Sequence, residues 1–301
     1  MNKFIRYFLD KDYRKLIQCN LGKYNWMGDY KFLKMKYSLC MGVALNIVSP
    51  STYNEKLQWL KLYDRKPEYV VMVDKYKVRE YIAEKIGEEY LIPLIGVWDS
   101  PDQIDFASLP HQFAMKCNHN SGLGMCICTD KSKLDTEKVK KDLARGLKQD
   151  YYLTSREWPY KDVPRKIIAE KFLKSDVGGL TDYKIHCFNG VPKFILVCSD
   201  RFTESGLTED FYTTEWNLMP VKRPNIPHAK ELHQRPERLD EMLELAAKLS
   251  ENIPFLRVDF YYVEEKIYFS ELTFFPASGF APFEPEEWDR TFGEWLELPN
   301  H

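Results

Sequence analysis

Two acidic residues near the end of the chain, Asp259 and Glu271, are spaced so that a hairpin could bring their side chains together. If the chain turns at Glu265, these carboxylates face each other and Arg257 faces Thr273. Facing side chains have Cβ atoms roughly 5 Å apart, so two carboxylates need a shared proton or a cation between them. Mg²⁺, which prefers oxygen ligands and often binds substrate phosphates, suits such a position. On spacing alone, however, an exposed hairpin with solvated acids is the commoner outcome.

Alternating apolar residues predict the two strands that must position these acids. A period of two with one apolar face is typical of a half-buried strand. The turn, Glu264-Glu265-Lys266, lacks the glycine that such loops favour. The expected apolar face consists of Leu256, Val258, Phe260 and Tyr262 on the first strand and Tyr268, Leu272 and Phe274 on the second.

A second group of residues suited to phosphate binding begins at Lys116. It precedes the small-residue loop 118–124, which joins predicted strands at 112–117 and 125–129. Backbone N–H groups of such a loop can cover phosphates, and the lysine supplies positive charge. The loop lacks the GxxxxGK[ST] pattern of a Walker loop. Loops rich in Asn and Gly also join many ordinary hairpins, so this signal is weak by itself.

Composition excludes several classes of protein. The 301 residues carry a formal net charge of -2, so no overall field attracts nucleic acid, and we expect no nucleic-acid partner. Seven scattered cysteines include no CxxC pair, which predicts reduced thiols and a cytoplasmic location. The N-terminal stretch is interrupted by charges, so we expect no signal peptide, and no run approaches the roughly 20 apolar residues of a membrane span.

Residues 1–50 look helical and carry no obvious chemistry. The first helix is both basic and aromatic, so it could make peripheral contact with a membrane surface. The commoner alternative is a helix that packs its apolar stripe on the body of the protein. The residues concerned are Phe4, Ile5, Phe8 and Leu9, near Lys3, Arg6, Lys11, Arg14 and Lys15.

The rest of the chain mixes predicted helices and strands. Helices are expected after the capping box Thr52–Glu55, from Asp74, at 135–150 and from Pro236. A strand is expected at 165–173, and Asn189-Gly190 predicts a hairpin between 182–188 and 193–198. Residues 199–230 look irregular and are a candidate substrate-binding region, with Arg201, Trp216 and Arg223 as candidate sugar and carboxylate contacts.

The order of these pieces resembles the ATP-grasp superfamily, and most closely its TupA-like family, named for teichuronopeptide biosynthesis. The similar segments are TYNEKLQWLKLYDR, VDKYKVREYIAEKIGEEYLIPLIGVWDS, FAMKCNHNSG, DYKIHCFNGVPKF and ELTFFPASG. The resemblance implies an α+β ATP-grasp fold, in which two α+β lobes grip ATP. Residues 1–50 would form a helical N-terminal extension to an ATP-grasp domain of residues 51–301, divided into an N-terminal part 51–110, a central lobe 111–172 and a C-terminal lobe 173–301.

The resemblance also implies the cofactors, ATP and Mg²⁺, and their binding residues. For ATP these are Lys75 and Lys116 on the phosphates, Ser121 and Gly122 in a closing loop, Glu170 and Leu173 at the adenine and ribose, and Lys184 as a further contact. For the metal they are Asp259 and Glu271, with Thr273 where many ATP-grasp enzymes have Asn. A Thr hydroxyl can still approach a metal or phosphate, but it is a shorter ligand than Asn.

For catalysis, the resemblance implies that Arg257, helped by Lys116, steadies the transferred phosphoryl group or the tetrahedral intermediate. The loop Pro276–Gly279, including Ser278, would face the second substrate. The implied reaction is an ATP-dependent carboxylate–amine ligation through an acyl phosphate. It would join an amino acid to a small-molecule or saccharide carboxylate, such as a uronic acid, in cell-surface polysaccharide synthesis.

Three alternatives remain at this point. A kinase of the same fold would phosphorylate a sugar or polyol hydroxyl. A glycosyltransferase would need a DxD metal motif, and the only DxD is Asp10-Lys11-Asp12 in a charged N-terminal helix. A non-catalytic nucleotide-binding scaffold would not need the set Lys116, Asp259 and Glu271, so their presence argues against it.

Overall fold

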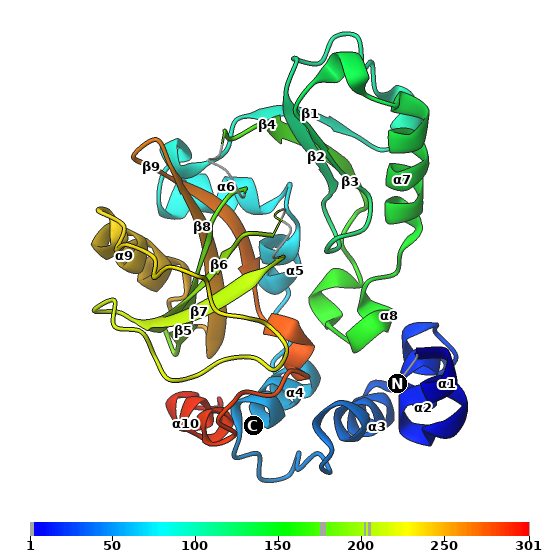
Figure 1. Cartoon of the computed structure of the whole chain (residues 1–301), viewed down its shortest axis with the longest axis vertical. Coiled ribbons are helices and arrows are strands. Elements are labelled where there is room, and N and C mark those ends of the chain that lie inside the picture. Colours follow the sequence, from blue (N-terminus) through cyan, green and yellow to red (C-terminus); the bar gives the residue numbers. More distant parts are fainter. Residues whose placement is uncertain (1–2, 175–178, 202, 204–205, 301) are drawn as a thin grey trace.

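The computed structural model describes residues 3–174, 179–201, 203 and 206–300 (Figure 1). Its framework is two antiparallel sheets. The four-stranded sheet has the order β1-β4-β2-β3 and the five-stranded sheet the order β7-β6-β5-β8-β9. The strands are β1 Leu94–Trp98, β2 Phe113–Cys117, β3 Met125–Cys128, β4 Ile167–Lys171, β5 Asp182–Phe188, β6 Val191–Ser199, β7 Thr208–Thr213, β8 Phe255–Val263 and β9 Lys266–Thr273.

Helices cover the sheets and link them. In Figure 1, α7 lies along the four-stranded sheet and α9 along the five-stranded sheet, while α5 and α6 lie towards the centre and α4 lies lower, beside α10. The helices are α1 Lys3–Leu9, α2 Lys11–Asn20, α3 Asp29–Met41, α4 Tyr53–Tyr63, α5 Glu68–Val73, α6 Val78–Lys85, α7 Thr136–Lys148, α8 Tyr152–Ser155, α9 Leu239–Leu249 and α10 Glu287–Trp295. The expected mixture of helices and antiparallel strands is therefore confirmed.

Each sheet has its own hydrophobic core. The larger core joins one face of the five-stranded sheet to α9, through residues such as Ile185, Val258 and Leu245. The smaller core packs α7 on the four-stranded sheet, where Leu143 meets Phe113. Because each sheet buries its apolar face on its own helices, the opposite faces are available to form a site between the sheets.

The β8–β9 hairpin has the predicted pairing for an unexpected reason. Asp259 pairs with Glu271, and Arg257 pairs with Thr273, as predicted. The turn is one residue tighter than expected, because Glu264 and Glu265 form a two-residue turn with φ of 50° and 62°. A register shift on the β9 side of Asp259–Phe260 compensates, leaving Ser270 as the extra residue.

Two predictions about this hairpin are wrong. β8 is not half-buried: Asp259 is 0% exposed although it lies on the polar face. The expected apolar phase of β9 also fails before the bulge, since Phe269 is buried and Tyr268 is only partly so. A bulge reverses which residues face the core, so an alternation counted from the far end of the strand has the wrong phase.

The stretch 199–230 is less irregular than predicted, because it contains strand β7, paired with β6. The polar residues of β7 hid the apolar alternation by which a strand is predicted. In the structure its two acidic residues are buried, and each is paired with a basic side chain. Glu209 lies 3.6 Å from Arg223, and the Asp210 carboxylate accepts a 2.7 Å hydrogen bond from His228. Sequence alternation cannot reveal a strand whose polar residues are neutralised by partners distant in the chain.

A close approach between α7 and the loop before β3 generates a prediction. A Cβ atom added at Gly146 would lie 2.7 Å from both Cys117 Sγ and Gly124 Cα. Alanine is normally favoured over glycine inside a helix by about 1 kcal/mol. We nevertheless expect Gly146→Ala to lower the free energy of unfolding, by about 1 kcal/mol or more, through overpacking. Urea unfolding measures this, with the exposed Lys141→Ala of the same helix as control. An unchanged or raised midpoint for Gly146→Ala would contradict the close approach.

Candidate active site

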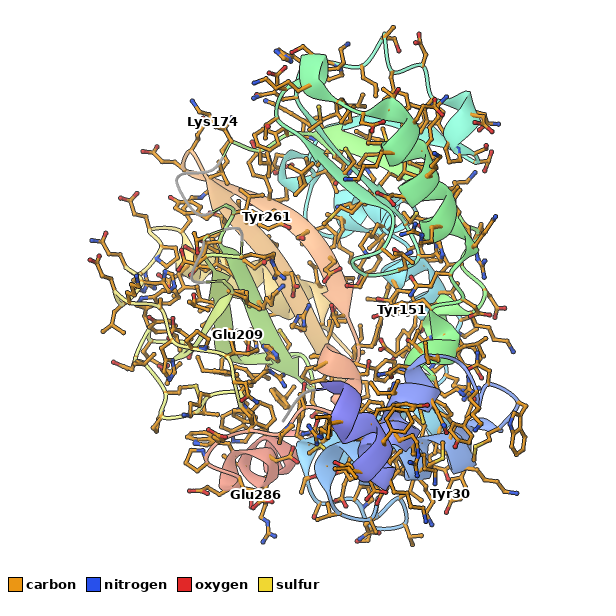
Figure 2. The ribbon with its side chains drawn as sticks, turned by 45° about the vertical axis from the view of Figure 1, so that its right-hand side comes forward. Tyr30, Tyr151, Lys174, Glu209, Tyr261 and Glu286 are labelled. Atoms are coloured by element: carbon orange, nitrogen blue, oxygen red, sulfur yellow. The ribbon has the colours of Figure 1, made fainter. Side chains whose placement is uncertain are left out.

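A cavity of about 550 Å³ lies between the two sheets and is lined by all seven residues predicted to bind ATP. Figure 2 labels one lining residue, Tyr261 of β8. The polar lining includes Lys75, Lys116, Ser121, Gly122, Glu170, Asp182, Lys184, Arg201, Ser270 and Glu271. The apolar lining includes Met115, Met125, Ile127, Phe172 and Leu173. One cavity thus combines a cationic region with an apolar region large enough to contact a flat ring.

On the four-stranded sheet, the polar centre of the cavity is the Glu170 carboxylate. Lys116 Nζ lies 2.8 Å from its Oε2, and Arg79 Nη1 lies 3.1 Å from its Oε1. Lys116 and Glu170 lie on neighbouring strands, two residues apart in register. Arg79, on α6, was not foreseen, since nothing in the helix pattern distinguishes it.

On the five-stranded sheet, the centre is the buried Asp259 carboxylate. Arg257 binds both oxygens, with Nε 2.7 Å from Oδ1 and Nη2 2.6 Å from Oδ2, and Lys184 Nζ lies 2.7 Å from Oδ2. Burial alone would raise the pKa of Asp259, but Arg257 and then Lys184 hold it below its ordinary value. The carboxylate is therefore ionised and neutralised by its neighbours.

Glu271 extends this network toward the cavity. Its Oε1 lies 3.2 Å from Arg257 and its Oε2 3.5 Å from Lys75. Burial raises the pKa of Glu271, but the Lys75 ammonium contributes to holding it below the ordinary value. Arg257 also donates to the Thr273 hydroxyl at 3.0 Å. Asp259 and Glu271, which we predicted to bind a metal cation, are thus paired in this structure with basic side chains.

Asp182 also belongs to this network and was missed from the sequence. It lies 3.5 Å from Lys184 on the same face of β5, and the spacing of two residues could have revealed it. With Arg201, 3.4 Å from Asp182, the network contains three carboxylates and four cations: Asp182, Asp259 and Glu271 with Lys75, Lys184, Arg201 and Arg257.

The residues present fit a cation that arrives with its own phosphate ligands. Among the described residues, no three His, Cys, Asp or Glu side chains are grouped to hold an ion by themselves. Glu271 reaches the cavity, Asp259 is paired with it across the hairpin, and Thr273 lies two residues further along β9. Two carboxylates and a hydroxyl are an incomplete shell for Mg²⁺, which commonly completes its shell with phosphate oxygens and water.

The loop 118–124 is anchored more firmly than its composition suggested. Asn118, His119 and Asn120 are buried. The Asn118 side chain donates to Asp74 at 2.7 Å and accepts from the Lys166 amide at 2.7 Å. The first three residues of the loop are therefore held in place by buried side chains. Ser121 and Gly122 are exposed and line the cavity, so they are the part able to close over a ligand.

The three candidate substrate contacts in 199–230 have different positions. Arg201 lines the cavity and lies 3.4 Å from Asp182. Arg223 is buried over the Phe283 ring and is not among the cavity-lining residues. Trp216 stacks on Tyr212, 4.3 Å away, on the face of β7 opposite to Glu209. Neither Arg223 nor Trp216 therefore lines this cavity.

Ser278 and Gly279 face helix α4 rather than the cavity. The Ser278 hydroxyl donates to the buried Glu157 carboxylate at 2.6 Å, and its carbonyl accepts from Lys61 at 2.7 Å. Gln58 donates to the carbonyl of Gly279 at 2.7 Å. Ala277 and Ser278 have φ of 47° and 56°, so these contacts hold a strained turn directly after β9. Sequence patterns gave no sign of these buried polar partners.

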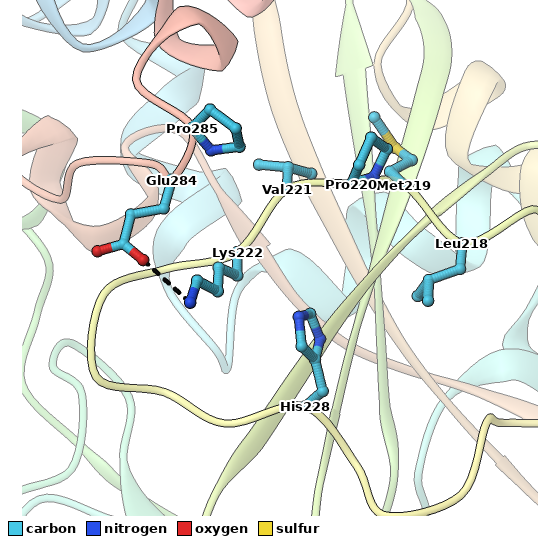
Figure 3. Close-up of a pocket in the computed structure, with 8 residues that line it drawn as sticks. All are labelled: Leu218, Met219, Pro220, Val221, Lys222, His228, Glu284 and Pro285. Carbon is cyan, nitrogen blue, oxygen red and sulfur yellow. Dashed lines mark ion pairs between the residues drawn. The ribbon is translucent and has the colours of Figure 1, made fainter.

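A second hollow, of about 370 Å³, lies beside the β7 end of the molecule (Figure 3). It is lined by Leu218, Met219, Pro220, Val221, Lys222, His228, Glu284 and Pro285. Its Lys222 and Glu284 form an ion pair at 3.1 Å. It contains none of the residues predicted for chemistry.

Two lobes, each with a sheet and helices, and a lysine-lined cavity between the sheets define an ATP-grasp protein. The model of the TupA-like ATP-grasp family matches residues 55–297, and the chain belongs to that family. The predicted family and fold are thus confirmed.

Several solved structures are similar at low identity. D-alanine–D-alanine ligase from Bacillus anthracis, complexed with ATP, is 16% identical, with 67% of this chain and 53% of that chain covered and a TM-score of 0.39. The Helicobacter pylori D-alanine–D-alanine ligase is 15% identical, with 83% and 70% covered and a TM-score of 0.44. The chain spans about half the length of the first of these. No curated protein matches the chain.

The buried Lys61 generates a prediction about pH. Burial lowers the pKa of its ammonium from 10.5 to about 7. Between these values the unfolded chain binds a proton that the folded chain does not, so this group makes stability rise with pH. We expect Lys61→Met to reduce that rise, by at most about 1.4 kcal/mol per pH unit.

Urea unfolding at several pH values between about 7 and 10 measures this slope. Lys85→Met, at an exposed lysine of α6, is the matched control and should keep the wild-type slope. Equal slopes in wild type and Lys61→Met would show that the buried lysine is not titrating as described.

Proposed function

We propose that this protein is an ATP- and Mg²⁺-dependent carboxylate–amine ligase that forms an amide through an acyl phosphate. The observation that carries the proposal is the network around Asp259. Arg257 and Lys184 meet at that carboxylate, and Arg257 also reaches Glu271. Lys184 and Glu271 line a cavity between the lobes of an ATP-grasp protein.

ATP would lie along the cavity, with its adenine in the apolar region and its phosphates in the cationic region. The apolar side chains near Leu173 suit adenine, while Lys75, Lys116 and Lys184 suit the phosphates. The exposed Ser121 and Gly122 can turn backbone N–H groups toward those phosphates. Closure there would keep water from the reactive phosphate.

Mg²⁺ would be held by Glu271 and Asp259, with the Thr273 hydroxyl beside them, and it would neutralise phosphate charge. Arg257 and Lys184 now occupy the oxygens of Asp259. Incoming phosphates are alternative anionic partners for both cations. We infer that nucleotide binding releases the Asp259 carboxylate by drawing these cations away.

The proposed chemistry has two steps. A substrate carboxylate oxygen attacks the γ-phosphorus, the bond to the bridging oxygen breaks, and ADP leaves. An amine nitrogen then attacks the acyl carbon, phosphate leaves, and the nitrogen loses a proton. Arg257, once drawn from Asp259 toward the phosphates, would stabilise charge that develops beside the metal.

The substrates we propose are the carboxylate of a uronic acid or similar saccharide and the amine of an amino acid, in cell-surface polysaccharide synthesis in the cytoplasm. The family resemblance supports this choice. Arg201, which lines the cavity and is half exposed, is the candidate contact for a substrate carboxylate. Ser278 and Gly279 would act indirectly, by fixing the turn that follows β9.

The test is ADP release with amino acids crossed against uronic acids and UDP-uronic acids, with product masses. ATP consumption should require a carboxylate and Mg²⁺, and hydroxylamine should trap the acyl phosphate as a hydroxamate.

Arg257→Lys keeps the positive charge but loses the planar, two-pronged guanidinium, so it should lower kcat far more than it raises the KM for ATP. Lys193→Arg, at an exposed lysine, is the control. A phosphorylated product without hydroxamate would identify a hydroxyl kinase instead.

A further inference from the structure

The N-terminal helices leave large apolar side chains in solvent. Ile5, Leu9 and Leu21 are 50%, 76% and 78% exposed, and Trp26 is 81% exposed. Phe8 is 60% exposed as well. The expectation that the first helix packs its apolar stripe on the body is therefore wrong for Ile5, Phe8 and Leu9; the side chain of Phe4 lies outside the described part. In Figure 1, α1 and α2 lie at one end of the molecule, beside α3 and away from both sheets.

The part of this exposed apolar surface around Trp26 is held in place by the rest of the protein. α2 packs against α3, and Cys19 of α2 is buried. The buried Arg156 guanidinium donates to the carbonyls of Asn25 and Met27, each at 3.1 Å, on either side of Trp26. Trp26 is thus held outward by a buried cation. A large indole held outward on a fixed turn, with other exposed apolar side chains in the same segment, marks a candidate interaction surface.

The same segment is strongly basic. Residues 1–50 contain nine Lys and Arg, three Asp and no Glu, a net charge of +6, whereas the whole chain carries -2. The remaining residues therefore carry -8. Arg6, Lys11, Lys23, Lys31 and Lys34 are exposed. Positive charge is thus concentrated where the exposed apolar side chains are.

We propose that this N-terminal surface, formed by Ile5, Leu9, Leu21 and Trp26 with the exposed cations, docks on an anionic lipid surface. Basic segments with exposed Trp and Leu insert their apolar side chains at the headgroup boundary and are attracted by anionic lipids. A second copy of this chain is disfavoured, because two surfaces of charge +6 repel each other. None of the helices in the described residues is long and apolar enough to cross a membrane, so docking here means lying on the surface.

Vesicle co-sedimentation of the full chain tests the proposal. The probes are phosphatidylcholine vesicles, with and without about a third phosphatidylglycerol. The wild type should sediment with the anionic vesicles, less so at high salt, and not with neutral vesicles. Leu21→Ser/Trp26→Ser should lower the partition coefficient at least about tenfold. Lys23→Gln/Lys31→Gln should lower it about fivefold for each charge removed.

Control variants use exposed positions elsewhere. Val191→Ser/Leu232→Ser replaces two apolar side chains that are 50% and 68% exposed, and Lys85→Gln/Lys141→Gln removes two exposed charges. Both variants lie outside the N-terminal surface and should bind like wild type. The proposal is overturned if wild type stays in solution, if neutral vesicles bind it equally, or if the controls lose binding as the test variants do. Concentration-dependent dimerisation that Leu21→Ser/Trp26→Ser abolishes, without vesicle binding, would assign the surface to a second copy instead.

Discussion

A carboxylate buried without solvent, Asp259, is the constraint on which the rest of the site depends. An ionised acid in such a place is strongly unfavourable unless it is paired and hydrogen-bonded on both oxygens. Here Arg257 and Lys184 supply three close contacts from the same strand and the neighbouring strand. The five-stranded sheet must therefore keep its register, because a slip of one residue would turn these groups to the opposite face.

Each of the two sheets holds one buried carboxylate between two basic side chains. Glu170 is held between Lys116 and Arg79 on one side of the cavity, as Asp259 is held on the other. Lys75 reaches Glu271 and also donates to the carbonyl of Asn120. One lysine thereby links the final hairpin to the small-residue loop. A triphosphate entering the cavity would find cations on both walls whose present partners are carboxylates, which it can replace.

Sequence reasoning reached the acids and lysines because periodicity and family motifs both report on them. It reached the Asp259–Glu271 pairing through two errors that cancelled, a turn one residue too long and a bulge left out. It could not predict contacts between residues far apart in the chain, such as the hydrogen bond from Lys61 to the Ser278 carbonyl. It also misjudged burial wherever a polar side chain has a partner far away in the chain, as in β7 and at Asn118.

The central claim is that nucleotide converts the neutralised Asp259–Glu271 pair into a metal site. A crystal structure with Mn²⁺ and a non-hydrolysable ATP analogue tests it most directly, because anomalous scattering locates the ion. The account predicts an ion bound by both carboxylates and by phosphate oxygens, with Arg257 and Lys184 drawn from Asp259 toward the phosphates. An ion bound by phosphates alone, with Arg257 and Lys184 still on Asp259, would contradict the account.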